Sequence, residues 1–335
     1  MIEQNATDWA DGKGPLIFGR VLDGNGGGRP IEWEEAANWK PGAAGEVLWV
    51  HLRRDNPEVR PWLEGAAGIP PTSAALLVSD STRPRAFRED GTLVATLRGI
   101  NFNADAQPED MISLQLWCDG ARLVTLRRAP MQTPRDVLAL LDSGRGPCDA
   151  AAAITQIVEQ LVARMNQSIV DMNDNIDRLE DADPDENTGK MLEQIASIRR
   201  NTLALKRHMS PQHEALEKIS RDAPDWFEDH DRREIAETID RLRRYLDDLD
   251  ISKESALVLQ DDIRARALAR SDRTNYLLTI VAAIFLPLGF LTGLLGINVG
   301  GIPGVDDPHA FWIVVAGCSF ILIALLMLFK WWKWL

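Results

Sequence analysis

Two long apolar runs occupy the end of the chain. Tyr276 to Ile297 is 22 residues without a charge, and Ala310 to Phe329 is another 20. A helix needs about 20 apolar residues to cross a bilayer core of about 30 Å, so each run predicts one membrane-spanning helix. We therefore expect a transmembrane domain over 274–335, divided into a first (pore) helix over 274–297, an outer loop over 298–309 and a second helix over 310–330.

A helical pattern precedes the first apolar run. Apolar residues step by four and three from Ile235 to Leu249, which predicts a heptad seam that could pack against copies of the chain. No Pro or Gly occurs between Asp225 and Pro287. The simplest interpretation is one helix from about 229 to 297, about 100 Å long at 1.5 Å per residue. With a helical hairpin before it, this helix predicts a stalk domain over 133–273.

Residues 1–132 alternate between strand-like and helix-like segments. β-forming residues and alternation predict strands at 46–52, 91–100, 111–118 and 121–128, and apolar periodicity predicts short helices at 31–39, 57–65 and 71–78. This order is typical of a sheet with helices packed on it. The predicted fold is an α+β cytoplasmic domain, a long helical stalk and two C-terminal transmembrane helices.

Charge changes this picture in two ways. The formal net charge of −13 argues against nucleic acid as a partner. Basic residues flank the two apolar runs, whereas the loop between the runs has no Lys or Arg, so the positive-inside rule places both termini in the cytoplasm and the loop outside. The expected location is a bacterial-type inner membrane, with a basic collar at the inner mouth formed by Arg270, Arg273, Lys330 and Lys333.

The soluble part offers little catalytic chemistry. The five histidines are scattered, and no metalloprotease, nucleophile-elbow or phosphate-loop motif is present, so we expect neither an enzyme nor a resident cofactor. His208 and His213 lie in one helical segment and are a candidate metal pair. The alternative is that both are ordinary histidines on the surface of a helix.

Two membrane helices per chain cannot enclose a water-filled path. A channel or transporter of this design must assemble around an axis, with one face of the first membrane helix lining the pore. The absence of ionisable side chains from both runs favours a hydrated ion passing weak polar sites and apolar constrictions. A membrane anchor whose apolar face merely packs is the alternative. The predicted pore-lining residues are Asn275, Leu278, Ala282, Leu286, Gly289 and Leu294.

A Gly-Ile-Asn tripeptide ends the first run. A ring of Asn298 side chains at the outward end of the pore helices could hydrogen-bond the water shell of a divalent cation, whereas a plain helix cap is the alternative for this residue. Asp306, Asp307 and His309 would add charge and a titratable group at the outer mouth. The letters alone mean little, because the same tripeptide occurs at 99–101.

The wider sequence around this tripeptide is specific. The stretch "FLPLGFLTGLLGINVGGIPG" (285–304), followed by a second apolar run, resembles the CorA family of divalent-cation transporters, and "NVGGIPG" and "MSPQ" (209–212) resemble its zinc-transporting ZntB branch. The resemblance implies a funnel-shaped homopentamer in the lipid bilayer, with Gly296, Ile297 and Asn298 as the selectivity motif. It implies Zn²⁺ as the transported ion, with transport linked to the proton gradient, and we favour uptake.

The sequence departs from the family pattern at two places. Ile297 replaces the usual Met of the motif, and the loop that follows has Gly300-Gly301-Ile302-Pro303 where the magnesium-transporting members carry an acidic residue. The second departure argues against magnesium as the main substrate. The alternatives that stay open are a Mg²⁺ or Co²⁺ channel of the same architecture, zinc efflux, and a membrane-anchored helical scaffold without transport.

Overall fold

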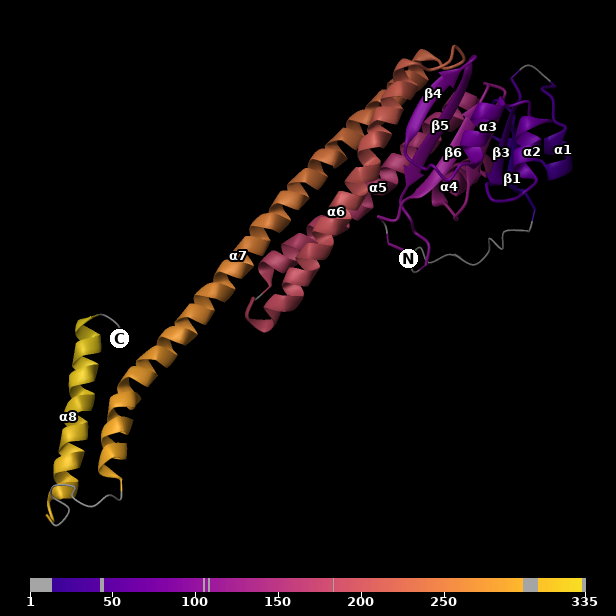
Figure 1. Ribbon diagram of the computed structural model, residues 1–335. Helices are drawn as coiled ribbons and strands as arrows, with labels where there is room; N and C mark the ends of the chain where they lie inside the picture. Colours follow the sequence, from indigo (N-terminus) through magenta and orange to yellow (C-terminus); the bar gives the residue numbers. More distant parts are fainter. Residues whose placement is uncertain are drawn as a thin grey trace. The chain divides into compact units, whose positions relative to one another are not determined.

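The computed structural model of the chain describes residues 14–42, 45–104, 106–107, 109–182, 184–297 and 307–332 (Figure 1). The chain divides into two compact units. The first comprises residues 1–183 and 189–260, and the second comprises residues 184–188 and 261–335. Each unit is described separately below.

A seven-stranded mixed sheet forms the centre of the first unit. The strands lie in the order β2-β1-β3-β7-β6-β5-β4, and every neighbouring pair is antiparallel except β3 and β7, which are parallel. Four strands match the predicted segments, and β1, β2 and β4 were not predicted. The strand bounds are β1 (Leu16–Leu22), β2 (Gly28–Pro30), β3 (Val47–Arg53), β4 (Arg85–Glu89), β5 (Thr92–Gly99), β6 (Ile112–Cys118) and β7 (Arg122–Arg127).

Two tight turns show why the sheet edge folds where it does. Asp90 and Gly91 join β4 to β5 with φ values of 46° and 79°, the left-handed geometry that a two-residue hairpin needs and that Asp-Gly tolerates. Asp119 closes the β6–β7 hairpin by donating its backbone N–H to Arg122 O at 3.3 Å.

Short helices cover one face of the sheet and longer helices cover the other. Leu63, Ile69 and Leu77 are buried in one cluster with β-strand residues such as Trp117 and Leu126. On the opposite face, α5 approaches β5 so closely that Gly99 faces Leu161. The helices of this region are α1 (Trp33–Ala37), α2 (Val59–Glu64), α3 (Pro71–Val78) and α4 (Gln132–Asp142).

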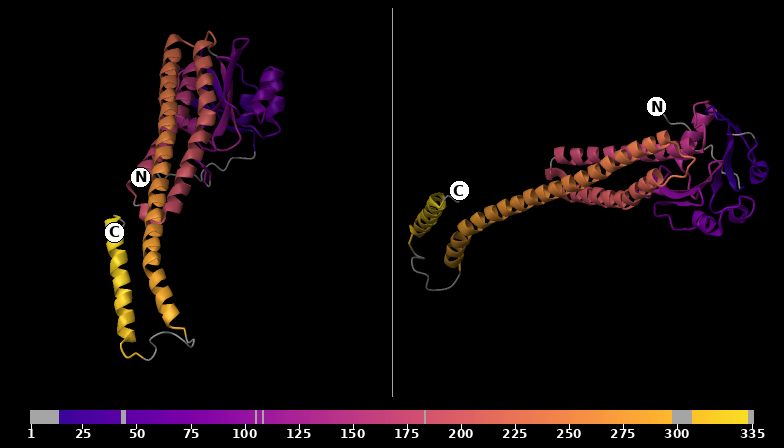
Figure 2. Two further views of the ribbon diagram at one scale, coloured as in Figure 1. Left: turned by 60° about the vertical axis from the view of Figure 1, so that its left-hand side comes forward. Right: turned by 90° about the horizontal axis from the view of Figure 1, so that it is seen from above.

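Three long helices follow the sheet (Figures 1 and 2). They are α5 (Ala150–Asp181), α6 (Pro184–Arg221) and α7 (Asp229–Leu295). Asp149 begins α5 by accepting a hydrogen bond from the Ala152 N–H at 2.8 Å, as an N-cap residue does. The non-helical backbone of Asn187 marks where two helical stretches of α6 meet.

The heptad seam of α7 packs within the chain. Ile235, Leu242, Leu249 and Ala256 are all at most 1% exposed, so the expectation that this seam packs against other copies is wrong. The α5–α6 hairpin already lies beside α7 in the first unit and supplies the apolar partner that the seam requires (Figure 2). The seam therefore stabilises the folded chain and leaves other faces of α7 for contacts between chains.

The second unit contains the end of α7 and the whole of α8 (Ala310–Trp331), which run side by side (Figures 1 and 2). Both helices are long and apolar enough to cross a membrane. Ile280 of α7 and Phe329 of α8 are 6% and 4% exposed, whereas most apolar side chains of the two spans are half-buried or exposed. The mixed α/β domain, the long helix and the two C-terminal apolar helices confirm the predicted fold class.

Candidate ion pathway

The membrane-spanning part of α7 has two unlike sides. Ile280 is buried and Ala283, Ile284, Pro287 and Leu288 are half-buried on the side that faces α8. The opposite side is open along the whole span. It contains the predicted pore residues Asn275, Leu278, Ala282, Leu286 and Gly289, all exposed in the single chain.

One predicted pore residue does not belong to this open side. At about 100° per residue, the five residues from Asn275 to Gly289 fall within an arc of about 80° around the helix axis. Leu294 falls about 120° from the centre of that arc, although its side chain is 51% exposed. The helical period therefore separates Leu294 from the other five, and we place it outside the pore face.

The span ends in a regular helix terminus. The Gly296 N–H donates to Thr292 O at 2.9 Å, and the Thr292 hydroxyl donates back to Leu288 O at 3.0 Å. Ile297 follows with 47% exposure. Asn298 lies outside the described residues, so the structure describes the first two positions of the predicted selectivity motif.

The structure describes part of the predicted outer mouth, namely the end of the loop that leads into α8. The Asp307 Oδ1 atom accepts a hydrogen bond from the backbone N–H of His309 at 2.8 Å and lies 3.4 Å from the imidazole Nδ1 of the same residue. Both side chains are exposed. Asp306 lies outside the described residues. The structure thus brings together one carboxylate and one imidazole immediately before α8 begins.

The predicted inner collar lies at the other end of the hairpin. Arg270 and Arg273 are exposed on α7 before the apolar span, and Lys330 is exposed in the last turn of α8. Lys333 lies outside the described residues. Cations at the last turn of α8 also suit the negative end of its helix dipole.

The predicted histidine pair does not form a metal site. His208 and His213 are five residues apart on the continuous helix α6, which places them about 140° apart around its axis. Burial and the nearby guanidinium groups of Arg98 and Arg207 lower the pKa of His208 to about 4. His213 instead lies 3.9 Å from the carboxylate of Glu217. Different faces and a positive environment at His208 both disfavour a shared cation.

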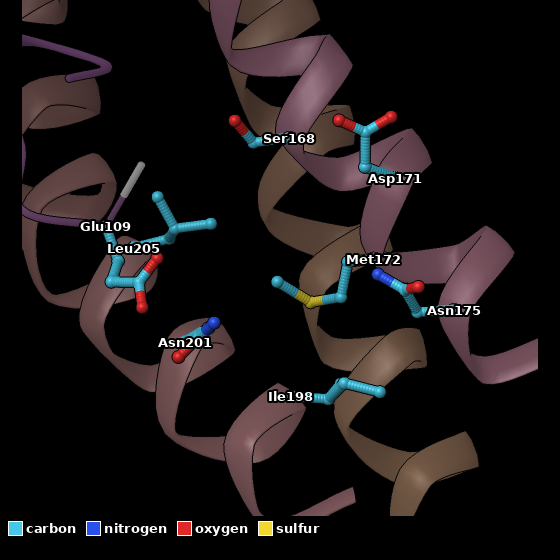
Figure 3. Close-up of a pocket in the computed structure, with 8 residues that line it drawn as sticks. All are labelled: Glu109, Ser168, Asp171, Met172, Asn175, Ile198, Asn201 and Leu205. Atoms are coloured by element: carbon cyan, nitrogen blue, oxygen red, sulfur yellow. The ribbon is translucent and has the colours of Figure 1, made fainter. Parts of the chain in front are cut away.

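A small cavity between α5 and α6 gathers several side-chain oxygens (Figure 3). Its volume is about 130 Å³, and Glu109 and Asp171 lie on opposite sides of it. Asp171 accepts a hydrogen bond from Gln167 at 2.7 Å, which engages one carboxylate oxygen. No group of three or more His, Cys, Asp or Glu side chains in the described part of the chain is placed to hold a metal ion.

Sequence reasoning missed an exposed apolar stripe on the stalk. Ile251 and Val258 are each 64% exposed and are seven residues apart on α7. Seven residues is two turns of helix, so the two side chains share one face, roughly opposite the buried seam. The spacing itself was readable from the sequence. The buried seam on the same helix has the same seven-residue period, and the heptad pattern was assigned to that seam alone.

The comparisons with known proteins agree with this architecture. The family described as "CorA-like Mg2+ transporter protein" matches residues 44–330. The divalent cation transporter CmaX of Pseudomonas aeruginosa is 37% identical over 321 residues, covering 95% of this chain and 94% of the relative. The zinc transport protein ZntB of Yersinia enterocolitica is 34% identical over 324 residues, covering 95% and 96% of the two chains.

A solved structure matches over nearly the same length. The structure of full-length CmaX superposes with a TM-score of 0.83 at 35% identity, and the match covers 96% of this chain and 98% of that one. The match includes the apolar helices as well as the α/β domain, because it spans almost the whole of both chains. The sequence match over most of the chain and this shared fold show that the chain belongs to the CorA family of divalent-cation transporters.

Proposed function

We propose that this protein forms a homopentameric pore that carries Zn²⁺ into the cell, coupled to the proton gradient, with a ring of Asn298 side chains as the selecting element. The observation that supports it most directly is the open side of the α7 span. Five neighbouring positions there are exposed although the span is apolar and α8 already covers the other side. A water-filled path needs such a side, repeated around an axis by several copies.

The stalk supports assembly in the same way. Ile251 and Val258 leave an apolar stripe exposed on α7, outside the bilayer-spanning part. Exposed apolar area of this kind is typical of a protein interface. Pentamers are what the family resemblance implies.

The chemistry of the open side favours a hydrated ion. Its side chains are neutral, and moving a bare divalent cation into a low-dielectric site without charged ligands costs far more than weak dipoles return. An ion that keeps its water shell needs only hydrogen-bond acceptors, which amide oxygens of Asn supply. The basic flanks at Arg273 and Lys330 support a cytoplasmic location for both ends of the hairpin.

Zinc is proposed over magnesium on two grounds. Relatives named for zinc transport match 94–95% of the chain at about a third identity. The loop after the motif also lacks the acid that the magnesium-transporting members carry. A Mg²⁺ or Co²⁺ channel is the second candidate, and it is favoured by the name of the matching family and by the broader name of CmaX.

Reconstitution of the full-length protein tests the proposal. Liposomes that contain a zinc-sensitive dye should show zinc influx with wild type, and Asn298→Ala should reduce the initial rate at least about tenfold. Asn101→Ala is the matched control, because Asn101 ends the other Gly-Ile-Asn tripeptide, in the α/β domain, and its Nδ2 donates to Asp110 O at 3.1 Å. Its flux should equal that of wild type.

The same vesicles separate the alternatives. Magnesium influx without zinc influx would support the second candidate, and no flux of either ion would support a scaffold. An imposed inward proton gradient should accelerate zinc influx. Equal rates with and without the gradient would remove proton coupling, and faster movement in the opposite direction would support efflux.

A further inference from the structure

A positively charged cavity opens in the first unit, between the start of β4, the strand β5 and the helix α6. Its volume is about 460 Å³, within the range of small-molecule sites. No acidic residue is among the described residues that line it. They are Ser81, Thr82, Arg83, Arg98, Arg207 and His208.

The arginines at this cavity have no carboxylate to neutralise them. Arg83, Arg98 and Arg207 take part in none of the ion pairs found among the described residues, although the whole chain carries 50 acidic and 37 basic side chains. In a chain with such an acidic excess, three guanidinium groups that converge without a carboxylate are an uncompensated positive site. Bringing such charges together is unfavourable unless an anion accompanies them.

One of the three guanidinium groups is fixed in place. Arg98 donates from Nε to Thr82 O at 3.0 Å, from Nη2 to the Thr82 hydroxyl and from Nη1 to Met111 O. These bonds use three of its five N–H donors and do not cancel its charge. Arg83 and Arg207 are exposed, so their guanidinium groups are free to turn toward a ligand. A rigid cation beside two mobile ones suits an anion with several oxygens.

We propose that Arg83, Arg98 and Arg207 bind the phosphate group of a small soluble ligand, with the hydroxyls of Ser81 and Thr82 as further hydrogen-bonding groups. Guanidinium groups bind phosphate oxygens in paired, charge-assisted hydrogen bonds, which makes arginine clusters suited to this chemistry. The source of the phosphate is either inorganic phosphate or a nucleotide. This site is separate from the ion pathway and does not depend on the ion that is transported.

Calorimetry on the detergent-solubilised full-length protein tests the proposal. In EDTA-containing buffer, wild type should bind inorganic phosphate or ATP, and Arg83→Gln and Arg207→Gln should each weaken that binding about tenfold or more. Arg200→Gln is the matched control, because Arg200 is exposed on the same helix two turns before Arg207. Its affinity should equal that of wild type. Arg98→Gln is avoided, since Arg98 also holds the backbone.

The outcomes distinguish inorganic phosphate from a nucleotide as the ligand. They also test the alternative that the cavity is a contact between copies of the chain. ATP that binds at least tenfold tighter than phosphate identifies a nucleotide site, and equal affinities identify a phosphate site. The proposal is overturned if wild type binds neither probe, or if the two glutamine variants bind as wild type does. A loss of oligomers in Arg83→Gln or Arg207→Gln, seen by size-exclusion chromatography with light scattering, would also overturn it and assign the cavity to a contact between copies.

Discussion

The interior of the α/β domain and the surface of the membrane hairpin use the same apolar side chains in opposite ways. Trp49 and Leu114 in the sheet are completely buried, whereas Phe285 and Leu286 in the first span are 67% and 76% exposed. The domain finds its apolar partners within one chain. The apolar side chains of the hairpin must pack against lipid or against other copies of the chain. Their exposure in the single chain therefore indicates surroundings that one chain does not provide.

The two Gly-Ile-Asn tripeptides show this difference at the scale of three residues. In the domain, a Cβ on Gly99 would lie 2.8 Å from the Leu161 side chain, Ile100 is 3% exposed, and Asn101 holds the following loop by hydrogen bonds. At the end of α7, Gly296 meets only its own helix, and Ile297 is 47% exposed. The first copy is explained by packing inside the chain, and the second is not.

Deleting an apolar side chain should separate the two regions most strongly. Leu114→Ala leaves a cavity in a close-packed core and should lower the free energy of unfolding by about 2–5 kcal/mol. Leu286→Ala removes a side chain with few neighbours in its own chain and should lower it by less than about 1 kcal/mol. Denaturation followed by circular dichroism measures both. Equal losses would mean that Leu286 packs inside the folded chain.

The two glycines provide a second, smaller contrast. Gly99→Ala forces a methyl group against buried Leu161, an overpacking change that should cost about 1–3 kcal/mol. At Gly296 the added methyl group would lie 3.1 Å from Thr292 O and 3.7 Å from Gly293 O of its own helix, so Gly296→Ala should change stability less. Thermal unfolding of the two variants in the same detergent checks the order. A larger loss for Gly296→Ala would contradict the assignment of packing roles.

The pH dependence of stability should come from the first unit, because the spans contain no acidic residue, basic residue or histidine. The pKa of His208 is about 4 in the folded chain and near 6.5 when unfolded, so the unfolded chain binds more protons between these values. Stability is therefore fully present above about pH 6.5 and falls as the pH falls toward 4. His208→Gln should flatten this fall in urea titrations, and His213→Gln should not. Identical slopes for His208→Gln and wild type would exclude His208 as a source.

Exposed ion pairs on the stalk should have the smallest effect. Lys206 pairs with Asp250 between α6 and α7, and both side chains are solvent-accessible. Asp250→Asn should lower the free energy of unfolding by at most about 1 kcal/mol, and added salt should diminish the difference from wild type. Chemical denaturation at low and high salt measures it. A salt-independent loss above that size would indicate that the pair is more buried than its exposure implies.

The sequence was most informative where a pattern has one physical cause. The length of α7 follows from 61 residues without a helix breaker after Asp225, and the spans follow from their lack of charge. The partner of each apolar stripe did not follow, because a heptad period is the same whether the stripe packs on its own chain or on a copy. Ile235 and Leu249 are buried within the chain, whereas Ile251 and Val258 are exposed.

The site showed the same division. Helical spacing puts five of the six predicted pore positions, from Asn275 to Gly289, on one side of α7, where each is exposed, and it puts Leu294 off that side. The arginine cavity was not predicted, because it joins residues 81–83, 98 and 207–208, which are far apart in sequence. His208 was singled out from the sequence, but its neighbours Arg98 and Arg207 were not. Because of these arginines the site attracts anions and not metal cations.

The central claim is that the open side of the α7 span faces water in the assembled protein. Cysteine accessibility tests it in a Cys148→Ser, Cys318→Ser background, because burial raises the pKa of the Cys118 thiol and leaves it unreactive. A charged, membrane-impermeant thiol reagent should label Ala282→Cys and block zinc influx, and it should leave Ile284→Cys, on the side that faces α8, unlabelled and active. Labelling of Ile284→Cys with protection of Ala282→Cys would contradict the account.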